Sequence, residues 1–233
     1  MKNKKYRLTL KKYKVQVLDQ EGEERTLTLR RVVALKNIIN DFGDVLVKEG
    51  ERGGFVERKE NLSQDGSSWI YDNAIVYERA CVSGDAAVRE HAHVYNDAKI
   101  RGYAQIGGEA RVCGEAVITN RAKIGGKAKI TGKANIFDKA QVFDNARIKG
   151  NVCVCGRAQV SGNAKVFGEA LVFENAKVCD LAKVSERAII RGNAVISGVA
   201  RIYGNARVSG DEQIAGHERV CTQEESKQEE EKE

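Results

Sequence analysis

Seven basic residues recur every 18 positions from residue 111 onward, and their spacing suggests a binding chemistry. The series consists of Arg111, Lys129, Arg147, Lys165, Lys183, Arg201 and Arg219. Two positions after a member of the series, or after His93 just before it, stand Tyr95, Lys149, Phe167 and Tyr203. Cations with interleaved aromatics are typical of surfaces that bind a polyanion, and the rings could stack on the bases of a single strand. The pattern predicts an acidic protein or nucleic acid as partner, and the alternative is a solvated face in a sequence rich in Lys and Arg.

The histidines are the candidates for acid–base catalysis. Glu109 follows His91 by 18 residues, and a contact between histidine and glutamate can orient a general base. His91 and Glu109 are therefore the catalytic candidates, with an ordinary surface histidine as the alternative. A zinc ion held by three histidines is not expected, because His217 lies far along the chain from the other two.

The six cysteines predict neither a disulfide nor a metal site. Cys153 and Cys155 stand on the same side of one expected strand, which is poor geometry for a disulfide, and no histidine is near them in the sequence. Reduced thiols indicate a cytoplasmic protein. No apolar run approaches the ~18–20 residues of a membrane span. None follows the basic N-terminus either, so a secretory signal is not expected.

A six-residue repeat explains how these side chains are positioned. Counting by six from Ile70 to Val220 gives 26 positions, and all are Ile or Val. The position four after each is Ala at 22 of 25 sites, and the position two after each is Gly at 15 and Asn or Asp at six. β-Branched residues suit a buried strand, Ala fits inward beside a bend, and Gly, Asn or Asp tolerate the left-handed backbone of a sharp corner. Three hexads make a triangular coil of 18 residues, and equivalent strands then stack about 4.8 Å apart.

The pattern Ile/Val-x-Gly/Asn/Asp-x-Ala-x resembles the hexapeptide repeat of left-handed β-helices, and the left-handed sense is an implication of that resemblance. KYRLTL at residues 5–10 and GGFVERKENLSQDGSSWIYDNAIV at residues 53–76 resemble an uncharacterised enterobacterial and phage-borne family of β-helix proteins catalogued as acetyltransferases. Enzymes of this fold bind an acyl donor between neighbouring subunits and use a histidine base. The resemblance therefore implies acetyl-CoA as the cofactor of an enzymatic alternative, and it also implies side-by-side trimers.

Sorting the outward residues by a period of 18 separates three faces. The first face is largely neutral and includes Gln141 and Gln159. The second face holds the seven basic residues, here called the basic column, and the residues two positions further on, here called the flanking column. The third face holds the apolar contact patch, which comprises Val117, Phe137, Cys153, Cys155, Leu171, Phe173 and Ile189. Such a patch usually marks a contact surface, so we expect self-association or the docking of a partner protein there.

The basic column places like charges next to one another, which destabilises the fold unless the charges bind a partner. Like charges about 5 Å apart repel by roughly 0.8 kcal/mol per pair in bulk water, before screening. Glu115, Glu169 and Glu186 at nearby corners are expected to offset part of this repulsion.

The chain divides into three predicted regions. Residues 1–68 do not follow the repeat and predict a small β-rich cap, with strands at 5–10, 13–19 and 25–35 and loops at 50–54 and 63–68. Gly53, Gly54 and Trp69 are expected to dock this cap on the first coil. Residues 69–221 predict the β-helix, and residues 222–233 an acidic, disordered tail. Glu212 and Glu218 replace the inward Ala, so these carboxylates are expected to swing outward or to loosen the last coil.

The sequence thus predicts an all-β protein, a left-handed parallel β-helix of about eight coils with an N-terminal cap. We expect a non-catalytic binding or scaffold module that acts through its surface, without a bound metal or cofactor. The phage-borne relatives imply an inhibitor or decoy of a host complex. The alternatives are an acetyl-CoA-dependent acyltransferase and a purely structural spacer.

Overall fold

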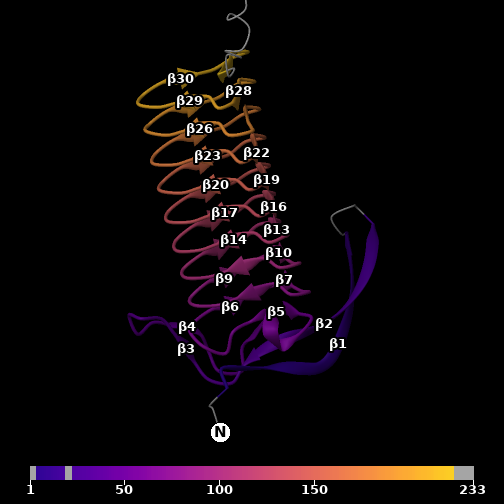
Figure 1. Ribbon diagram of the computed structural model, residues 1–233. Helices are drawn as coiled ribbons and strands as arrows, with labels where there is room; N and C mark the ends of the chain where they lie inside the picture. Colours follow the sequence, from indigo (N-terminus) through magenta and orange to yellow (C-terminus); the bar gives the residue numbers. More distant parts are fainter. Residues whose placement is uncertain (1–3, 19–22, 223–233) are drawn as a thin grey trace, which may run out of the picture.

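Each hexad forms one short strand and one corner, and both apolar positions of the hexad point into the coil. The Ile or Val residues from Ile70 to Ile214 and the Ala residues from Ala74 to Ala206 are buried. In the computed structural model, which describes residues 4–18 and 23–222, the strands stack as an all-β parallel solenoid (Figure 1). The predicted fold class is confirmed, and the left-handed sense of the coil stays a prediction of the resemblance.

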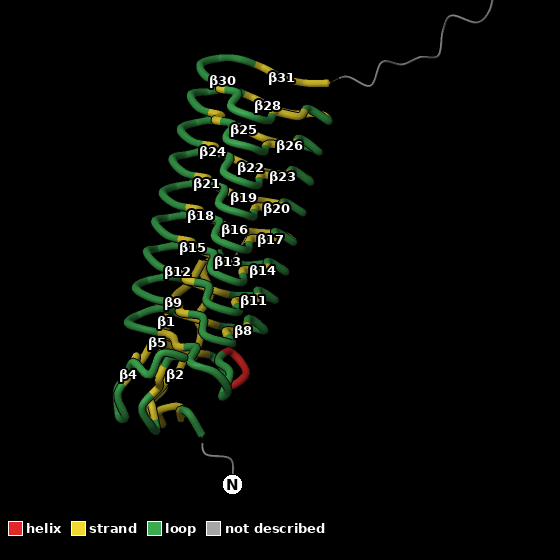
Figure 2. The backbone as a smooth tube through the Cα atoms, turned by 90° about the vertical axis from the view of Figure 1, so that its left-hand side faces the viewer, coloured by secondary structure: helices red, strands yellow, loops and turns green. Residues whose placement is uncertain are grey.

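Three sheets form the three walls, and Figure 2 shows their strands rising one coil at a time. The first face is a nine-stranded sheet of β6 (Trp69–Ile70), β9 (Ala87–Val88), β12 (Gln105–Ile106), β15 (Lys123–Ile124), β18 (Gln141–Val142), β21 (Gln159–Val160), β24 (Lys177–Val178), β27 (Val195–Ile196) and β30 (Gln213–Ile214). The third face is an eight-stranded sheet of β8 (Cys81–Val82), β11 (Lys99–Ile100), β14 (Val117–Ile118), β17 (Asn135–Ile136), β20 (Cys153–Val154), β23 (Leu171–Val172), β26 (Ile189–Ile190) and β29 (Arg207–Val208).

The second face is the largest sheet, because strands of the N-terminal region extend it. Its solenoid strands are β7 (Ile75–Val76), β10 (His93–Val94), β13 (Arg111–Val112), β16 (Lys129–Gly132), β19 (Arg147–Gly150), β22 (Lys165–Gly168), β25 (Lys183–Val184), β28 (Arg201–Gly204) and β31 (Arg219–Thr222). Below β7 the same sheet continues through β5 (Arg52–Val56), β2 (Glu24–Ala34) and β1 (Tyr6–Leu18), which makes 12 strands. Neighbouring solenoid strands pair in parallel, each residue opposite the one 18 positions later, as in Arg147 with Lys165.

The corners explain the second position of the repeat. All 25 residues found every six positions from Asp72 to Gly216 have positive φ, and ten of them are not glycine. Four of the ten are Glu, which is not among the residues expected at a corner and for which this conformation costs about 1–2 kcal/mol. Each of the eight Asp and Glu corners accepts a hydrogen bond from the backbone N–H of the corner residue one coil further on. Glu174 Oε2, for example, lies 2.6 Å from the nitrogen of Gly192, and such charge-assisted bonds offset the strain.

The N-terminal region closes the base of the solenoid. Tyr6, Val32, Ile38, Val47 and Val56 belong to the same buried cluster as the coils. The short strands β3 (Ile38–Ile39) and β4 (Val45–Val47) pair with each other, and a 3-10 helix, η1 (Lys59–Asn61), lies before the first coil. The expected division of the chain at residue 68 stays a prediction, because the second face runs without a break from β1 to β31.

Trp69 and Lys5 are the buried residues that join the base to the first coil. The Trp69 side chain is only 1% exposed and meets the Tyr6 ring edge-on, with centroids 6.4 Å apart. Lys5 Nζ donates to carbonyl oxygens of the loop before β6, including that of Ser68 at 3.0 Å, and its burial lowers the Lys5 pKa to about 8. Trp69 thus lies at the expected junction.

Two features of the N-terminal region differ from the sequence prediction. The strands expected at 5–10 and 13–19 are one strand, β1, because both parts pair with β2 across a register shift between Leu8 and Lys12. The loop expected at 50–54 is largely strand β5, which pairs with both β2 and β7. Position 53 of this strand requires glycine, because a Cβ there would come within 2.3 Å of the Ile70 carbonyl oxygen.

At the other end the two irregular carboxylates point outward, as expected. Glu212 and Glu218 are exposed, and each folds back on its own corner. Glu212 Oε1 accepts from the Ser209 N–H at 3.2 Å and Glu218 Oε1 from the Ala215 N–H at 3.3 Å. The tail predicted at 222–233 begins inside β31, which includes Thr222, and its remainder lies outside the described residues.

Candidate functional site

The basic column lies in one straight row on the second face, in the order that the 18-residue count predicts. Each member pairs in register with the next, from Arg111 beside Lys129 to Arg201 beside Arg219. Five of the seven side chains are exposed, and Arg111 and Lys183 are half-buried. Within residues 4–18 and 23–222, no ion pair involves a member of the column. The row therefore presents its charge to solvent.

The three corner acids expected to offset this charge are engaged elsewhere, which corrects the prediction. Glu115 Oε1 lies 3.7 Å from Lys133 Nζ and Glu169 Oε2 lies 3.3 Å from Arg187 Nε. Glu186 Oε2 accepts the Gly204 N–H at 2.8 Å. The three carboxylates thus bind other groups at the corners of the coil and form no ion pair with the basic column.

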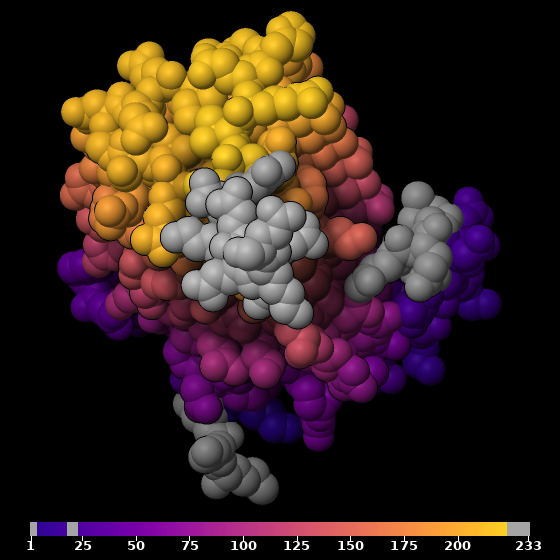
Figure 3. Space-filling view, turned by 45° about the horizontal axis from the view of Figure 1, so that its top comes forward, coloured from indigo at the N-terminus to yellow at the C-terminus, as the bar shows by residue number. Residues whose placement is uncertain are grey.

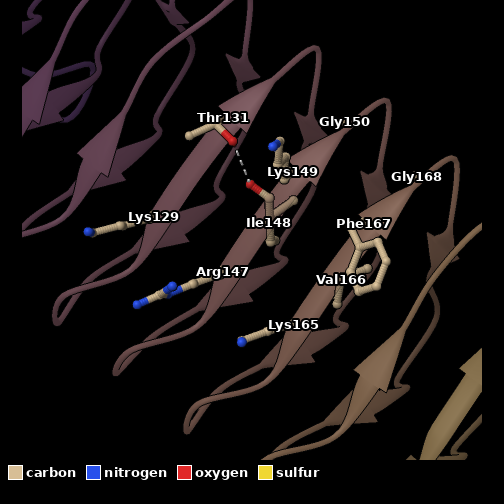
Figure 4. A pocket seen from close by; sticks show the side chains of 10 residues that line it. All are labelled: Lys129, Thr131, Arg147, Ile148, Lys149, Gly150, Lys165, Val166, Phe167 and Gly168. Carbon is tan, nitrogen blue, oxygen red and sulfur yellow. Dashed lines mark hydrogen bonds between the residues drawn. The ribbon is translucent and has the colours of Figure 1, made fainter. Parts of the chain in front are cut away.

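A cavity of about 500 Å³ lies on the middle of the second face, across β16, β19 and β22. We call it the basic groove, and its lining residues are Lys129, Thr131, Arg147, Ile148, Lys149, Gly150, Lys165, Val166, Phe167 and Gly168. Figure 4 shows Lys129, Arg147 and Lys165 near the beginning of their strands, with Lys149 and Phe167 further along theirs. The lining thus holds four cations, one aromatic ring and no acid.

Glycine at the neighbouring corner keeps the groove open. Gly132, Gly150 and Gly168 occupy successive corners beside the flanking column, and none carries a side chain over the groove. Gly150 has φ 104°, and a Cβ there would come within 2.6 Å of the Gly168 carbonyl oxygen. Thr131 and these glycines were not singled out from the sequence, although three successive glycine corners next to basic residues were a readable signal.

The β1–β2 hairpin covers the N-terminal end of the same face, and this corrects one predicted binding residue. Figure 1 shows the hairpin curving away from the base, and in Figure 3 its indigo atoms stand beside the solenoid. Val17, Leu27 and Leu29 of the hairpin form a buried cluster with Tyr77 and Tyr95. The two tyrosine rings stack at 4.9 Å, and Tyr95 is only 6% exposed. Tyr95 therefore belongs to a packed interface within the chain and cannot meet a partner.

The remaining flanking residues are accessible to different degrees. Phe167 is 39% exposed, Lys149 is exposed and Tyr203 is half-buried. Phe167 and Lys149 line the basic groove, whereas Tyr203 lies two coils further along the column. The structure thus brings Lys129, Arg147 and Lys165 together with two of the predicted flanking residues.

His91 and Glu109 are not assembled as a catalytic pair. Glu109 Oε2 lies 3.6 Å from Lys127 Nζ, and in the described part of the chain neither a hydrogen bond nor an ion pair joins Glu109 to His91. His93 is the more unusual histidine, because burial and the adjacent Arg111 lower its pKa to about 4. A neutral, half-buried imidazole beside an arginine is a packed residue of the second face.

The apolar contact patch lies on the third face and is less exposed than predicted. Among its large side chains only Leu171 is exposed, at 36%, and the others are half-buried. Val117 is separated from Cys153 by Asn135, because the three residues lie opposite one another on successive strands. The continuous apolar part therefore runs from Cys153 through Leu171 to Ile189.

No group of three His, Cys, Asp or Glu side chains among the described residues is arranged to hold a metal ion. Residues 4–18 and 23–222 include no helix that is long and apolar enough to cross a membrane.

Comparison with known proteins supports the resemblance on part of the chain. A family model described as "YdcK Beta solenoid repeat" matches residues 200–216. The curated protein "Uncharacterized acetyltransferase YdcK" of Escherichia coli (strain K12) is 37% identical over 73 residues, which cover 31% of this chain and 20% of that protein. The chain thus matches about a fifth of the length of this curated relative. Both matches agree with a β-helix that resembles proteins catalogued as acetyltransferases.

Proposed function

We propose that the protein is a non-catalytic binding module that engages an acidic protein or a nucleic acid along its basic column. The observation that carries this proposal is the basic groove, in which four cations line a cavity of about 500 Å³ and no acid is present. A concave site lined by one sign of charge focuses its field and attracts an oppositely charged partner. The volume lies within the range of ordinary ligand sites.

The contacts of the corner acids Glu115 and Glu169 support the same proposal. A sequence that only needed soluble surface could place Glu or Asp in the column, yet seven coils in succession carry Lys or Arg. Glu115 and Glu169 are paired with other cations, so the positive charge of the groove is left to an external anion. The resemblance to phage-borne proteins extends the proposal to an inhibitor or decoy of a host complex. We place this activity in the cytoplasm, because we expect the cysteines to be reduced.

An acetyl-CoA-dependent acyltransferase is the second candidate, and the partial likeness to a protein named as an acetyltransferase favours it. In that case the phosphates of acetyl-CoA would need a basic site, and the basic groove offers one. The chain lacks an assembled His91–Glu109 pair, so the base would have to come from elsewhere. A ligand that binds the folded state raises the melting temperature. A shift with acetyl-CoA that Lys129→Glu abolishes would favour this candidate.

The apolar contact patch is proposed as the surface for self-association or for a partner protein. Its continuous part, from Cys153 to Ile189, lies on the third face, away from the basic column. Two such surfaces would let one molecule join an anionic partner to a second copy of itself. Light scattering on the wild type and on Leu171→Lys tests this, and a monomer in both cases would exclude self-association through the patch.

The decisive experiment for the binding module is a comparison of two triple variants. The test variant carries Lys129→Glu, Arg147→Glu and Lys165→Glu. The control carries Lys99→Glu, Lys123→Glu and Lys177→Glu, which are exposed at the same repeat position on the other two faces. Both variants change the net charge equally. In pull-downs from the natural host at low and high salt, the test variant should lose the captured partner and the control should keep it. Equal capture by both would reject the proposal.

A further inference from the structure

We propose that the anion bound in the basic groove is a single-stranded nucleic acid, with its phosphates on the basic column and a base stacked on Phe167. This inference rests on the proposed binding function and specifies its ligand. It follows from three features of the second face: two parallel stripes of different chemistry, a ring with a free face, and the contrast with the hairpin-covered end.

The two stripes match the two parts of a nucleotide chain. Lys129, Arg147 and Lys165 lie on successive strands about 4.8 Å apart. The flanking column lies two residues further along each strand, which is about 6.6 Å. Lys149 and Phe167 stand in that second stripe (Figure 4). A strand that runs along the solenoid axis can thus keep its backbone on the cations and turn its bases toward the flanking column.

Phe167 is the stacking platform that this arrangement requires. Its side chain is 39% exposed and lines the groove. Among the described residues, no ring pair and no cation–π contact involves it. The neighbouring corner, Gly168, has no side chain that could cover the ring. A base in a duplex has no free face for such a ring, whereas an unpaired base does, so the platform favours a single strand.

The hairpin-covered end shows what this face looks like where polypeptide binds it. There the residues aligned with the basic column are Ile75 and His93, and the flanking residues are the buried Tyr77 and Tyr95. The hairpin contributes Val and Leu side chains to that interface. The first cation, Arg111, is half-buried beside Cys113, which still belongs to the hairpin cluster, and beyond this coil the aligned positions are Lys and Arg. The open part of the face is therefore unlike the part that packs against polypeptide, and this contrast favours a nucleic acid over an acidic protein.

Fluorescence anisotropy with a labelled oligothymidylate of about 12 nucleotides tests the proposal, since single-strand sites span roughly 4–16 nucleotides. Salt dependence gives a first measure. The slope of log K against log salt is about −0.7 per phosphate contact on a single strand. Replacing Lys129, Arg147 and Lys165 by Glu should therefore make the slope shallower by about 2. An oligouridylate of equal length should behave alike if the groove reads backbone and stacking only.

Variants of Phe167 separate stacking from charge. Phe167→Leu keeps an apolar side chain and removes the ring, so the affinity should fall about tenfold, within the range for one stacked base, while the salt slope is unchanged. Phe167→Trp should restore or strengthen binding. Phe143→Leu, on the first face, is the matched control and should bind like the wild type. Equal binding by wild type, Phe167→Leu and Phe167→Trp would overturn the stacking assignment.

Two further ligands distinguish failure of this inference from failure of the proposed function. If poly-L-glutamate binds as tightly as the oligonucleotide and Phe167→Leu affects neither, the groove binds anions but is not a nucleic-acid site. A preference for duplex over single strand would also overturn the inference. If no polyanion binds, or if the triple variant on the other two faces loses binding as much as the groove variant, the proposed function fails as well.

Discussion

Removing one charge from the basic column should stabilise the fold. Lys165 lies between Arg147 and Lys183 on neighbouring strands, about 4.8 Å apart. Two unit charges at that distance repel by about 0.9 kcal/mol in bulk water. Side chains splay, and a Debye length of about 10 Å at 0.1 M salt weakens the repulsion further. For two neighbours we expect Lys165→Gln to raise the free energy of unfolding by roughly 0.5–1 kcal/mol.

Lys123→Gln is a closely matched control. Lys123 occupies the same position of the repeat and is also exposed, but it lies between Gln105 and Gln141. The same substitution there removes no repulsion between like charges. We therefore expect a change within about 0.5 kcal/mol, as for most surface substitutions.

Thermal unfolding at low and high salt is the assay. A gain of this size corresponds to a rise of about 1–4 °C in a chain of this length. At about 1 M salt the Debye length is about 3 Å, so the advantage of Lys165→Gln should disappear. A gain that persists at high salt, or an equal gain for Lys123→Gln, would refute repulsion as the cause. Because Lys165→Gln should also weaken anion binding, stability and binding should change in opposite directions, as they do at many functional sites.

Three other predictions concern the corners, the base and the second face. Glu174→Ala should cost about 1 kcal/mol more than Glu174→Gly in urea unfolding, since both variants lose the carboxylate hydrogen bond but only Ala keeps the strain of φ 61°. Gly53→Ala should destabilise the base by about 1–3 kcal/mol through overpacking. Trp69 is the single tryptophan and is buried at this base. Its fluorescence emission should therefore shift to longer wavelength at urea concentrations below the main unfolding transition, because the loosened base exposes the ring to water. The pKa of His93 is lowered to about 4 in the folded state, against about 6.5 when unfolded. Stability should therefore fall as the pH drops from about 6.5 to about 4, and the fall should be smaller in His93→Gln by urea unfolding at pH values of about 7 and 5. Equal effects of the two Glu174 variants, an unchanged emission spectrum, or identical pH profiles would contradict the respective arguments.

The solenoid could be predicted from the sequence because its repeat has no insertion. A single count by six locates the buried Ile and Val residues from Ile70 to Ile214, and a count by 18 assigns the neighbours on each face. The corner residues could be predicted only in part, because residue type alone does not show how a non-glycine corner is stabilised. Glu90 and Glu186 look unsuited to a left-handed backbone, and only the structure shows their carboxylates bonded to the amide one coil above.

The candidate site could be predicted only in part. Periodicity places Lys129, Arg147 and Lys165 in one row, because the strands are parallel and in register. It cannot place the hairpin, whose strands follow another pattern, and so it left Tyr95 on an open surface. The groove itself was not predicted. The glycine corners Gly132, Gly150 and Gly168 recur every 18 residues and could have indicated it, but the side-chain contacts that turn Glu115 and Glu169 toward Lys133 and Arg187 could not be read from the repeat.

The hairpin has a consequence for how the second face can be used. Identical coils alone would offer a linear ligand many equivalent positions, each one coil apart, and the ligand could slide between them. The hairpin ends this translational symmetry by covering the face near Tyr77 and Tyr95. A ligand on the row of cations therefore cannot extend past this end of the face. The row then has a fixed length, from Arg111 to Arg219. Affinity for a chain-like anion should accordingly increase with ligand length only until that length is filled.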